Sequence, residues 1–558
     1  MKKILMVLLA LMVMFTGVAC GRDGGVDVDA NKTQIYVDHY NGGFGDAWLK
    51  KVIKRFETEY ANYQGANGKV GVQVIVNNHK NQGTQIIDSI SGSSQDVYFS
   101  DMLYYDLVAK DVALDISDVV TEENSDGKTV QSKFFPEQTD YLKYNGRFYA
   151  LPHYEIFSNV TYNATVFEEN LLYFSARPNV NGGFIISPTD TRSAGPNGKT
   201  GVIDGVDYSY DDGLPATYDD FYKLLNKMKT SGVIPFTWSG EYGKAYMNGM
   251  LTWLQADYEG KEQMYLNYSF GGTEGKMAKH LVESINSDGT VNFAPETLIK
   301  VNEGYKIYNS AGRYYALTML EKILSDPAYY YVGSGVDSHT DAQKRFVLSN
   351  YDKKNYQKPI AMFVDGNYWE NEAETVNIFA TLKNVYNTTR EDCVFKLMPA
   401  PKVDASKVGV ENSVVISRGN SIAFINANMQ TRAPERIEIC KEFLKFCYTD
   451  ESLREFTTTT NTTKALDYTL EDADVAKLTP FAQSVYNLKM QSDVVCPKSN
   501  SAPMMLNQST VNEVWATSSV NFVYETIKTG TTAKAYFESF KSEYNSVWWN
   551  QLFGSLFN

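Results

Sequence analysis

The sequence predicts an α/β protein built from more than one lobe. Between residues 33 and 110, short apolar runs typical of strands take turns with amphipathic stretches that have helical spacing. This β-α-β-α-β order favours a parallel sheet with helices on both faces. The chain has 558 residues, of which 43% are hydrophobic. It is too long for a single hydrophobic core, so we expect at least two lobes.

The first lobe should begin with three strands, each followed by a helix. The strands are predicted at Thr33–Val37, Val70–Val76 and Val97–Phe99. The helices are predicted at Asp46–Tyr60, Gln82–Ile90 and Leu103–Lys110. Ligands bind beyond the carboxyl ends of such strands, which indicates a binding cleft near Tyr40, Asn41 and Asp101. Asp101 could equally cap the helix that follows it, and the two roles can coexist.

The N-terminus has the pattern of an export signal. Lys2 and Lys3 precede an apolar run, Ile4–Phe15, that is too short to span a bilayer. We expect residues 1–19 to be removed. The cysteine that follows, Cys20, resembles the acylated residue of a bacterial lipobox, and residues 20–32 have the composition of a flexible leash. Ordinary secretory cleavage, with Cys20 an incidental thiol, is the alternative.

The composition argues against a nucleic-acid partner. The 52 Lys and Arg residues stand against 66 Asp and Glu, a formal net charge of −14, whereas nucleic acid or anionic lipid requires a basic face. Aromatic residues are abundant, with 39 Tyr, 29 Phe and 7 Trp. Tyr and Trp combine a flat apolar face with a polar edge, which suits stacking on sugar rings. Any single aromatic residue is nevertheless more often part of the core.

No pattern indicates a metal or another cofactor. The five histidines are scattered, and no Cys-x-x-Cys occurs. Cys440 and Cys447 lie in one predicted helix, about 10 Å apart along its axis, which is too far for a disulfide. We expect both to be buried free thiols. A bond between Cys393 and Cys496 stays open, because an extracellular compartment would permit it.

Several segments resemble, in the same order, the landmarks of one family. The most specific is Tyr144–Pro152 followed by Thr161–Asn163, which is similar to the family's crossing into its second lobe. The others are Ser94–Phe99 with Leu114–Ile116, Thr217–Phe221, Ala361–Trp369, Phe395–Pro401 and Glu442–Phe446. From about Gln34 to its C-terminus, the chain resembles the family 1 extracellular solute-binding proteins of ABC importers.

The resemblance implies a periplasmic-binding-protein-like fold of type II, with two α/β lobes joined by a multi-strand hinge. Lobe 1 would comprise residues 33–152 plus about 395–460, and lobe 2 residues 153–394 plus about 461–558. It also implies a monomeric receptor without catalytic activity or cofactor. Such a receptor captures a sugar between its lobes, is anchored outside the cell by its lipid, and delivers the sugar to the permease of an ABC transporter.

Eight residues are expected to contact the ligand. Tyr154 and Glu155 follow the first crossing, and Trp238 ends a predicted strand of lobe 2. Tyr368 and Trp369 both lie near the aromatic position of the family, and the sequence leaves open which of them faces the ligand. The full set is Tyr40, Asn41, Asp101, Tyr154, Glu155, Trp238, Tyr368 and Trp369.

Other functions stay open. A peptide receptor or a surface sensor or adhesin could share the fold, although a peptide receptor would more naturally carry a charged anchor for a chain terminus. A glycoside hydrolase needs two carboxyl groups facing across one site, and no local motif pairs two acids. Two stretches, Ser175–Pro215 and about Gly271–Asn350, exceed the usual length of the family. We expect them to extend the cleft for an oligosaccharide.

Overall fold

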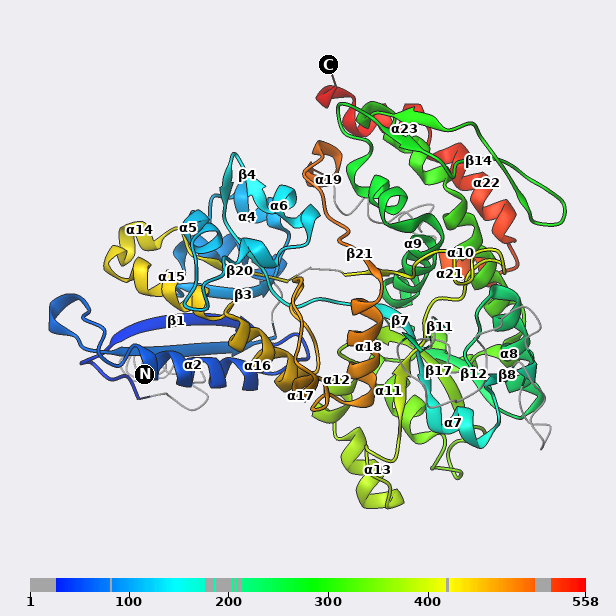
Figure 1. Ribbon diagram of the computed structural model, residues 1–558, viewed down its shortest axis with the longest axis horizontal. Coiled ribbons are helices and arrows are strands. Elements are labelled where there is room, and N and C mark those ends of the chain that lie inside the picture. Colours follow the sequence, from blue (N-terminus) through cyan, green and yellow to red (C-terminus); the bar gives the residue numbers. More distant parts are fainter. Residues whose placement is uncertain are drawn as a thin grey trace, which may run out of the picture.

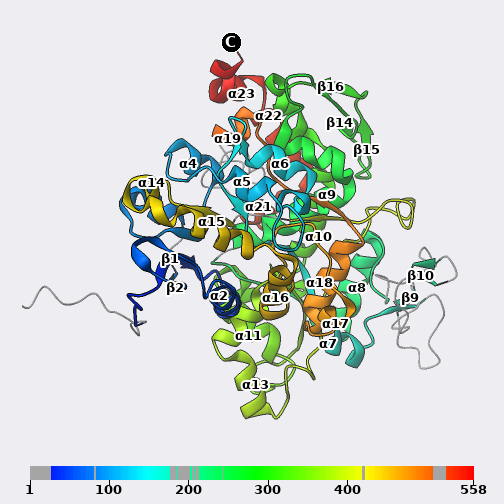
Figure 2. The ribbon, with the colours of Figure 1, turned by 60° about the vertical axis from the view of Figure 1, so that its left-hand side comes forward.

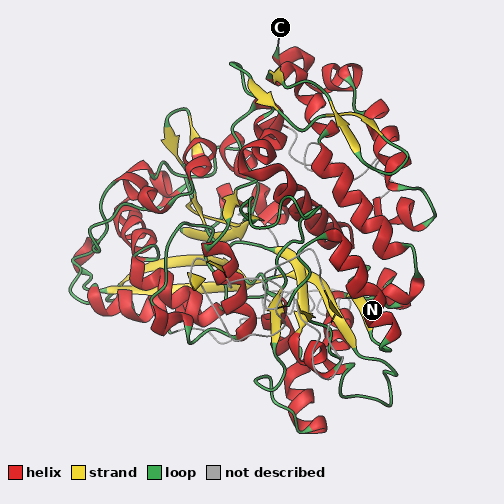
Figure 3. Cartoon of the chain, turned by 45° about the vertical axis from the view of Figure 1, so that its right-hand side comes forward, coloured by secondary structure: helices red, strands yellow, loops and turns green. Residues whose placement is uncertain are grey.

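The structure is a computed structural model, which describes residues 27–80, 83–175, 185–186, 202–203, 206–207, 213–241, 243–417, 421–506 and 523–557. The predicted signal and Cys20 lie outside the described residues. The described chain forms two lobes side by side, each a sheet with helices packed around it (Figures 1 and 3). The predicted two-lobed α/β architecture is confirmed.

The sheet of lobe 1 has the strand order β2-β1-β3-β20-β6. Its first three strands are parallel, as predicted, and β20 runs antiparallel to both β3 and β6. The carboxyl ends of β1 and β3 therefore meet at one edge of the sheet. The bounds are β1 (Thr33–Tyr40), β2 (Val72–His79), β3 (Val97–Asp101), β6 (Leu151–Pro152) and β20 (Ser421–Ile425).

Helix α2 (Ala47–Glu59) shows why the sequence folds this way. Its buried side chains Trp48, Leu49, Val52 and Phe56 recur at helical spacing and form one apolar stripe. Helix α16 (Asp450–Thr460), about 400 residues later, lies beside it (Figures 1 and 2). The other helices of this lobe are α3 (Gly83–Ile86), α4 (Tyr104–Ala109), α5 (Ser117–Thr121), α6 (Pro136–Leu142), α14 (Met429–Arg432), α15 (Ile437–Phe446) and α17 (Asp472–Val475).

The helix predicted over Gln82–Ile90 is wrong in its second half. The α-helix ends at Ile86, and a 3₁₀ segment, Ile87–Gly92, follows. Serine and glycine are weak helix formers, and Ser89, Ser91 and Gly92 are concentrated in this segment.

Lobe 2 is built on a sheet with the order β12-β17-β7-β18. Strands β12 (Ile234–Trp238) and β17 (Ile360–Gly366) are parallel, whereas β7 (Ser158–Asn163) pairs antiparallel with β17 and with β18 (Phe395–Leu397). Every residue of β17 is buried, as expected of a central strand. The main helices are α7 (Ala164–Glu169), α8 (Tyr218–Thr230), α9 (Gly243–Ser269), α10 (Ala311–Leu324), α11 (His339–Leu348), α12 (Trp369–Thr375), α13 (Ile378–Tyr386) and α18 (Pro480–Met490).

Lobe 2 also carries small strand pairs and a group of C-terminal helices (Figure 2). The stretch Gly271–Asn350 begins with two of these pairs and continues into α10 and α11. The pairs are β8 (Phe174–Ser175) with β9 (Ile185–Ile186), β10 (Val202–Ile203) with β11 (Val206–Asp207), β13 (Lys276–Ala278) with β16 (Thr297–Ile299), and β14 (Val282–Ile285) with β15 (Val291–Phe293). The helices are α19 (Ala502–Leu506), α21 (Val523–Lys528), α22 (Ala533–Glu543) and α23 (Ser546–Phe553).

The chain passes between the lobes after β6, between β19 (Val414–Ile416) and β20, and between α16 and α18. Strand β19 pairs with β21 (Asp493–Val495) on the lobe 2 side. The segment Tyr144–Pro152, which resembles the crossing into the second lobe, lies within lobe 1: it runs through the hairpin of β4 (Lys143–Tyr144) and β5 (Arg147–Phe148) and ends in β6. Its turn residues Asn145 and Gly146 have φ values of 50° and 80°, which closes a tight hairpin.

The return to lobe 1 comes later than the sequence suggested. Phe395 lies on β18, which belongs to the sheet of lobe 2, and lobe 1 resumes only at Ser421 on β20. Both segments are short and apolar, so their sequences alone do not tell which sheet each one joins.

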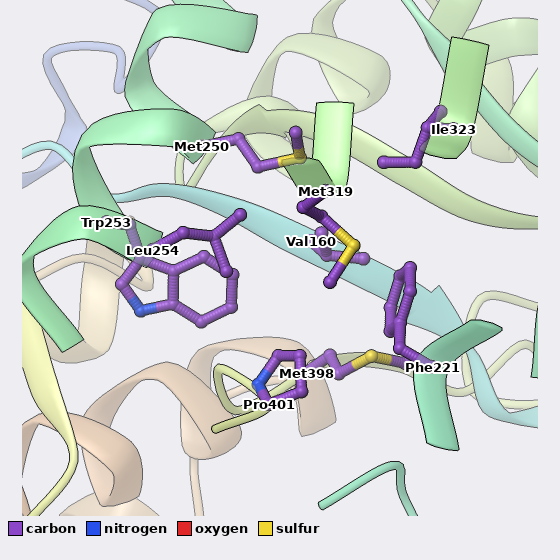
Figure 4. Close-up of a pocket in the computed structure, with 9 residues that line it drawn as sticks. All are labelled: Val160, Phe221, Met250, Trp253, Leu254, Met319, Ile323, Met398 and Pro401. Carbon is purple, nitrogen blue, oxygen red and sulfur yellow. The ribbon is translucent and has the colours of Figure 1, made fainter. Parts of the chain in front are cut away.

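A small cavity in the interior of lobe 2 is shown in Figure 4. Nine apolar side chains, among them Trp253 and Met319, enclose about 10 Å³, which is marginal even for one water molecule. The cavity is therefore a gap in the core packing and not a ligand site.

The four described cysteines are all buried and free. They are Cys393, Cys440, Cys447 and Cys496. The prediction for Cys440 and Cys447 is confirmed, and no disulfide joins Cys393 to Cys496.

Candidate ligand-binding site

Three side chains of lobe 1 gather at the carboxyl ends of its strands. Tyr40 ends β1, Asp101 ends β3, and Tyr154 follows β6. The Tyr154 hydroxyl donates a hydrogen bond to Asp101 Oδ1. Tyr154 is only 3% exposed, whereas Tyr40 and Asp101 are partly exposed. Lobe 1 thus presents an aromatic face together with a carboxylate acceptor.

Burial and hydrogen bonding shift the pKa of both members of this pair. Burial raises the pKa of Asp101, while hydrogen bonds from Tyr154 and Ser421 and the charge of Lys498 oppose that shift. Burial, followed by the Asp101 charge, raises the pKa of Tyr154 well above its usual value. Tyr154 therefore keeps its proton at neutral pH and acts as a donor. A carboxylate has about four acceptor positions, so Asp101 can also accept from ligand hydroxyls.

The facing wall comes from lobe 2. Tyr368 lies directly before α12 and is partly exposed, and its hydroxyl donates to the Tyr246 hydroxyl at 3.4 Å. Both rings are close enough to Asp365 and Glu372 for these charges to raise the pKa of the tyrosines, after burial as the main cause. Both tyrosines thus keep their protons at neutral pH, and Tyr368 is the one whose ring contacts a residue of lobe 1, Phe44.

Asp365 and Glu372 are held together by one amide. Gln343 Nε2 donates to Glu372 Oε2 at 2.7 Å and lies 3.4 Å from Asp365 Oδ2. Burial raises the pKa of both carboxyl groups, and for Asp365 the Glu372 charge raises it further. No Lys or Arg of the described chain forms an ion pair with either carboxylate.

A loop in which Asn41 was the one predicted contact residue joins the two walls. In Asn41–Gly45, the Phe44 ring centroid lies 4.5 Å from that of Tyr154 and 5.8 Å from that of Tyr368. Phe44 was missed as a site residue, although an aromatic ring between glycines next to Asn41 was a usable signal. Tyr246 was also missed, because nothing in its local sequence separates it from the core residues around it on α9.

Three expected contact residues lie in the interior instead. Trp369 is 0% exposed and packs among Phe363, Phe395 and Phe481, and Trp238 is 1% exposed beside Tyr330 and Tyr524. Both rings fill the core of lobe 2, so we remove them from the candidate site. Tyr368 is the residue of its pair that faces lobe 1.

Glu155, the third, takes part in a buried ion pair at the hinge. Lys489 Nζ donates to its Oε1 at 2.8 Å, and the Ser417 hydroxyl donates to its Oε2 at 2.6 Å. Its backbone N–H donates to the Thr463 carbonyl at 3.2 Å. Burial raises the pKa of Glu155, and the Lys489 charge opposes that shift. Through its carboxylate and its backbone N–H, Glu155 therefore connects all three passages between the lobes, and the carboxylate is not available to a ligand.

A hollow with a volume of about 650 Å³ lies between α6 of lobe 1 and α9 of lobe 2. Its lobe 1 wall includes Glu137 and Asp140 of α6, and its lobe 2 wall includes Lys261 and Tyr265 of α9 and Lys276 of β13. Lys261 Nζ lies 3.2 Å from Glu137 Oε1, so one ion pair spans it. Part of this wall belongs to the long stretch that begins near Gly271.

Two further findings concern metal binding and membrane-spanning helices. Among the described residues, no group of three His, Cys, Asp or Glu side chains could hold a metal ion. In the same part of the chain, no helix is both long and apolar enough to cross a membrane.

Solved structures with the same arrangement are binding proteins. RafE from Streptococcus pneumoniae matches with a TM-score of 0.53 at 14% identity, over 93% of this chain and 99% of its own. The chitin oligosaccharide binding protein has a TM-score of 0.51 at 13% identity, over 92% and 98% of the two chains. The chain has the two-lobed fold of these solute-binding proteins.

A third structure with this solute-binding fold is the cyclic α-maltosyl-1,6-maltose binding protein from Arthrobacter globiformis. It has a TM-score of 0.51 at 13% identity, over 93% of this chain and all of its own. RafE is also known in complex with raffinose. No model of a known protein family matches the chain, and no curated protein sequence matches it either.

Proposed function

We propose that this protein is an extracellular receptor that captures a carbohydrate between its two lobes and delivers it to an ABC permease. One observation carries the proposal: the Tyr154–Asp101 pair of lobe 1 faces Tyr368 of lobe 2 across the Phe44 loop. Aromatic faces for stacking and a carboxylate for hydroxyl groups are the two elements that a sugar site needs. The chitin oligosaccharide, raffinose and maltosyl-maltose ligands of the structural neighbours support the same class of ligand.

The energies fit a receptor that must release its ligand. Each ring against a pyranose contributes on the order of 1 kcal/mol beyond burial of its surface. Micromolar binding needs about 8 kcal/mol in total, so stacking has to be combined with several hydrogen bonds. The candidate site offers Asp101, Tyr154, Tyr246 and Tyr368 for these bonds.

The carboxyl groups favour binding over glycoside hydrolysis. A glycosidase places two carboxyl groups on either side of the scissile bond. Asp365 and Glu372 instead share one side-chain amide on lobe 2, and Asp101 is engaged by Tyr154 on lobe 1. We therefore propose a receptor without catalytic activity.

The location of the receptor follows from its N-terminus. We propose that Cys20 carries the lipid that holds the protein at the outer face of the cell membrane. Mass spectrometry of the membrane fraction tests this point, and we expect an N-terminal peptide that begins with acylated Cys20. An unmodified N-terminus at any other residue contradicts the anchor.

Isothermal titration of the chain from Asp27 onward tests the function. The panel contains raffinose, maltose, maltotriose and chitin oligosaccharides, with a mixture of oligopeptides as control. We expect saturable binding of one glycan series with a Kd in the micromolar range and no consumption of the ligand. Heat from the peptides alone favours the peptide receptor, and turnover of a glycan favours the hydrolase.

The hollow between α6 and α9 leads to a proposal about the length of the ligand. We propose that the added surface of lobe 2 serves a longer glycan, because its first strand pair supplies part of a wall that faces lobe 1. A length series from disaccharide to hexasaccharide tests this. Affinity should rise with chain length, and equal affinity for disaccharide and hexasaccharide rules the extension out.

A further inference from the structure

The Phe44 ring lies between a tyrosine of lobe 1 and a tyrosine of lobe 2. Its ring centroid lies 4.5 Å from that of Tyr154 in lobe 1 and 5.8 Å from that of Tyr368 in lobe 2, with interplanar angles of 51° and 80°. These are ordinary separations for packed aromatic pairs. The two tyrosines that face each other across the site are thus already bridged by a ring of the protein itself.

The loop that carries Phe44 is bonded to lobe 1 alone. The Asn41 backbone N–H donates to the His79 carbonyl at 2.8 Å, and the Gly45 N–H donates to Asn41 Oδ1 at 3.0 Å. Among the described residues, no hydrogen bond connects Asn41–Gly45 to lobe 2. The loop meets lobe 2 through the ring contact with Tyr368 and through packing beside Glu372.

The glycines of this loop are required by its position between the lobes. A Cβ at residue 42 would lie 2.8 Å from the Tyr154 hydroxyl, and one at residue 43 would lie 3.2 Å from Glu372 Cγ. Gly43 and Gly45 also have φ values of 92° and 70°, which glycine adopts without strain. A segment rich in glycine and held from one side can move without disturbing the sheet of lobe 1.

We propose that Phe44 is an internal stand-in for the ligand, which fills the gap between Tyr154 and Tyr368 in the empty protein and must be displaced when a sugar ring binds there. This inference rests on the proposed function and adds a selection rule to it. A ligand has to offer a ring whose stacking and hydrogen bonds together outweigh the phenyl contacts of Phe44. Small polar solutes without such a ring are excluded from the site.

When Phe44 fills the site in some of the molecules, only the remaining molecules can bind ligand. The apparent Kd is then the Kd of the open site divided by the fraction of molecules in which the site is free. If Phe44 is in place in about nine molecules of ten, the apparent Kd is about tenfold weaker than that of the open site. Removal of the Phe44 ring should therefore lower the apparent Kd by this factor. A ring that merely stacks on the ligand would behave in the opposite way, because its removal would weaken binding.

The test compares wild type, Phe44→Ala and Phe44→Leu. Val385→Ala is the control, since Val385 is 64% exposed on α13, outside the stretches assigned to the ligand. Small-angle X-ray scattering of the empty proteins should give a larger radius of gyration for Phe44→Ala, because a contact between the lobes is lost. The leucine variant should have an intermediate radius of gyration, and that of the control should be unchanged.

Titration with whichever glycan of the panel binds wild type should give a severalfold to tenfold lower Kd for Phe44→Ala.

Unchanged scattering of Phe44→Ala, or a Kd that rises, overturns the proposal. If no glycan of the panel binds wild type or variant, the proposed function has failed, and the scattering of the empty proteins alone decides whether Phe44 holds the lobes together. The thermal unfolding curve of each variant shows that the comparison is made on folded protein, as expected for a partly exposed loop residue.

Discussion

Two adjacent aromatic residues at the start of α12 have different environments. Tyr368 is partly exposed toward lobe 1, whereas Trp369 is fully buried in the core of lobe 2. Successive residues of a helix point about 100° apart, so only one of the two can face the cleft. The sequence gives both residues similar aromatic character, and only the packing of β17 and β18 against Trp369 separates their roles.

Replacement of Tyr368 tests that assignment. We expect Tyr368→Ala to weaken glycan binding about five- to tenfold, the loss of one stacking contact, whereas Tyr368→Phe should retain most of the affinity. Isothermal titration measures both. Equal affinity in wild type and Tyr368→Ala would remove this residue from the site.

The buried pair of Glu155 and Lys489 makes a prediction about stability. Lys489→Met leaves the Glu155 carboxylate buried without its cation, which should cost about 3–5 kcal/mol in the free energy of unfolding. Urea denaturation measures this cost. Glu471→Gln is the control, because its pair with Arg454 is largely exposed and is expected to contribute only about 0–1 kcal/mol. A loss in Lys489→Met no larger than in the control contradicts the structural role of the pair.

At the scale of elements, the segment after α16 contains a lysine in an aromatic cage. Lys464 is 0% exposed, and its Nζ lies 4.3 Å from the Tyr448 ring centroid and 4.9 Å from that of Trp48. The same atom lies 3.0 Å from His153 Nδ1. Burial lowers the pKa of Lys464 from 10.5 to about 7, so the folded protein holds this side chain neutral at alkaline pH.

This shift predicts a dependence of stability on pH. Between about pH 7 and the unfolded-state pKa, the unfolded chain binds a proton at Lys464 that the folded chain does not bind. The contribution of Lys464 to the free energy of unfolding should therefore rise with pH in this range. Urea unfolding of wild type at about pH 7.5 and about pH 9 should show a larger increase than Lys464→Met. If the free energy of unfolding increases equally with pH in both proteins, Lys464 is not the group responsible for the increase.

The elements of lobe 1 were predictable because their patterns are local. The buried face of α2 and the strands β1 and β3 follow from apolar periodicity alone. The sheet membership of the later strands was not predictable from the sequence, since Phe395–Leu397 and Ser421–Ile425 are both short and buried. Which sheet each one joins is decided by pairing with distant strands.

The site was predictable to the same extent. Tyr40 and Asp101 follow from the rule that ligands bind at the carboxyl ends of parallel strands. Trp238 also ends a strand, but its side chain points into the core among aromatic residues that the sequence does not show to be neighbours. Glu155 was misassigned because its partner, Lys489, is 334 residues away.

At the scale of the whole molecule, several contacts join the lobes, among them the Lys261–Glu137 ion pair and the hydrogen bond from Asn371 Nδ2 to the Thr460 carbonyl. The Glu155 ion pair joins the passages between the lobes by charge and hydrogen bonds, whereas the Phe44 loop connects the lobes by packing alone. Domains that are joined at a few chain passages can open and close around a ligand. We propose that the sugar is captured between the lobes in this way.

A crystal structure of the protein with the glycan that binds most tightly in titration tests this claim most directly. We predict a sugar ring between the lobes, in contact with Tyr368 from lobe 2 and within hydrogen-bond distance of Asp101 from lobe 1, with Phe44 displaced. A glycan bound on the outer surface of one lobe, with Phe44 still between Tyr154 and Tyr368, would contradict it.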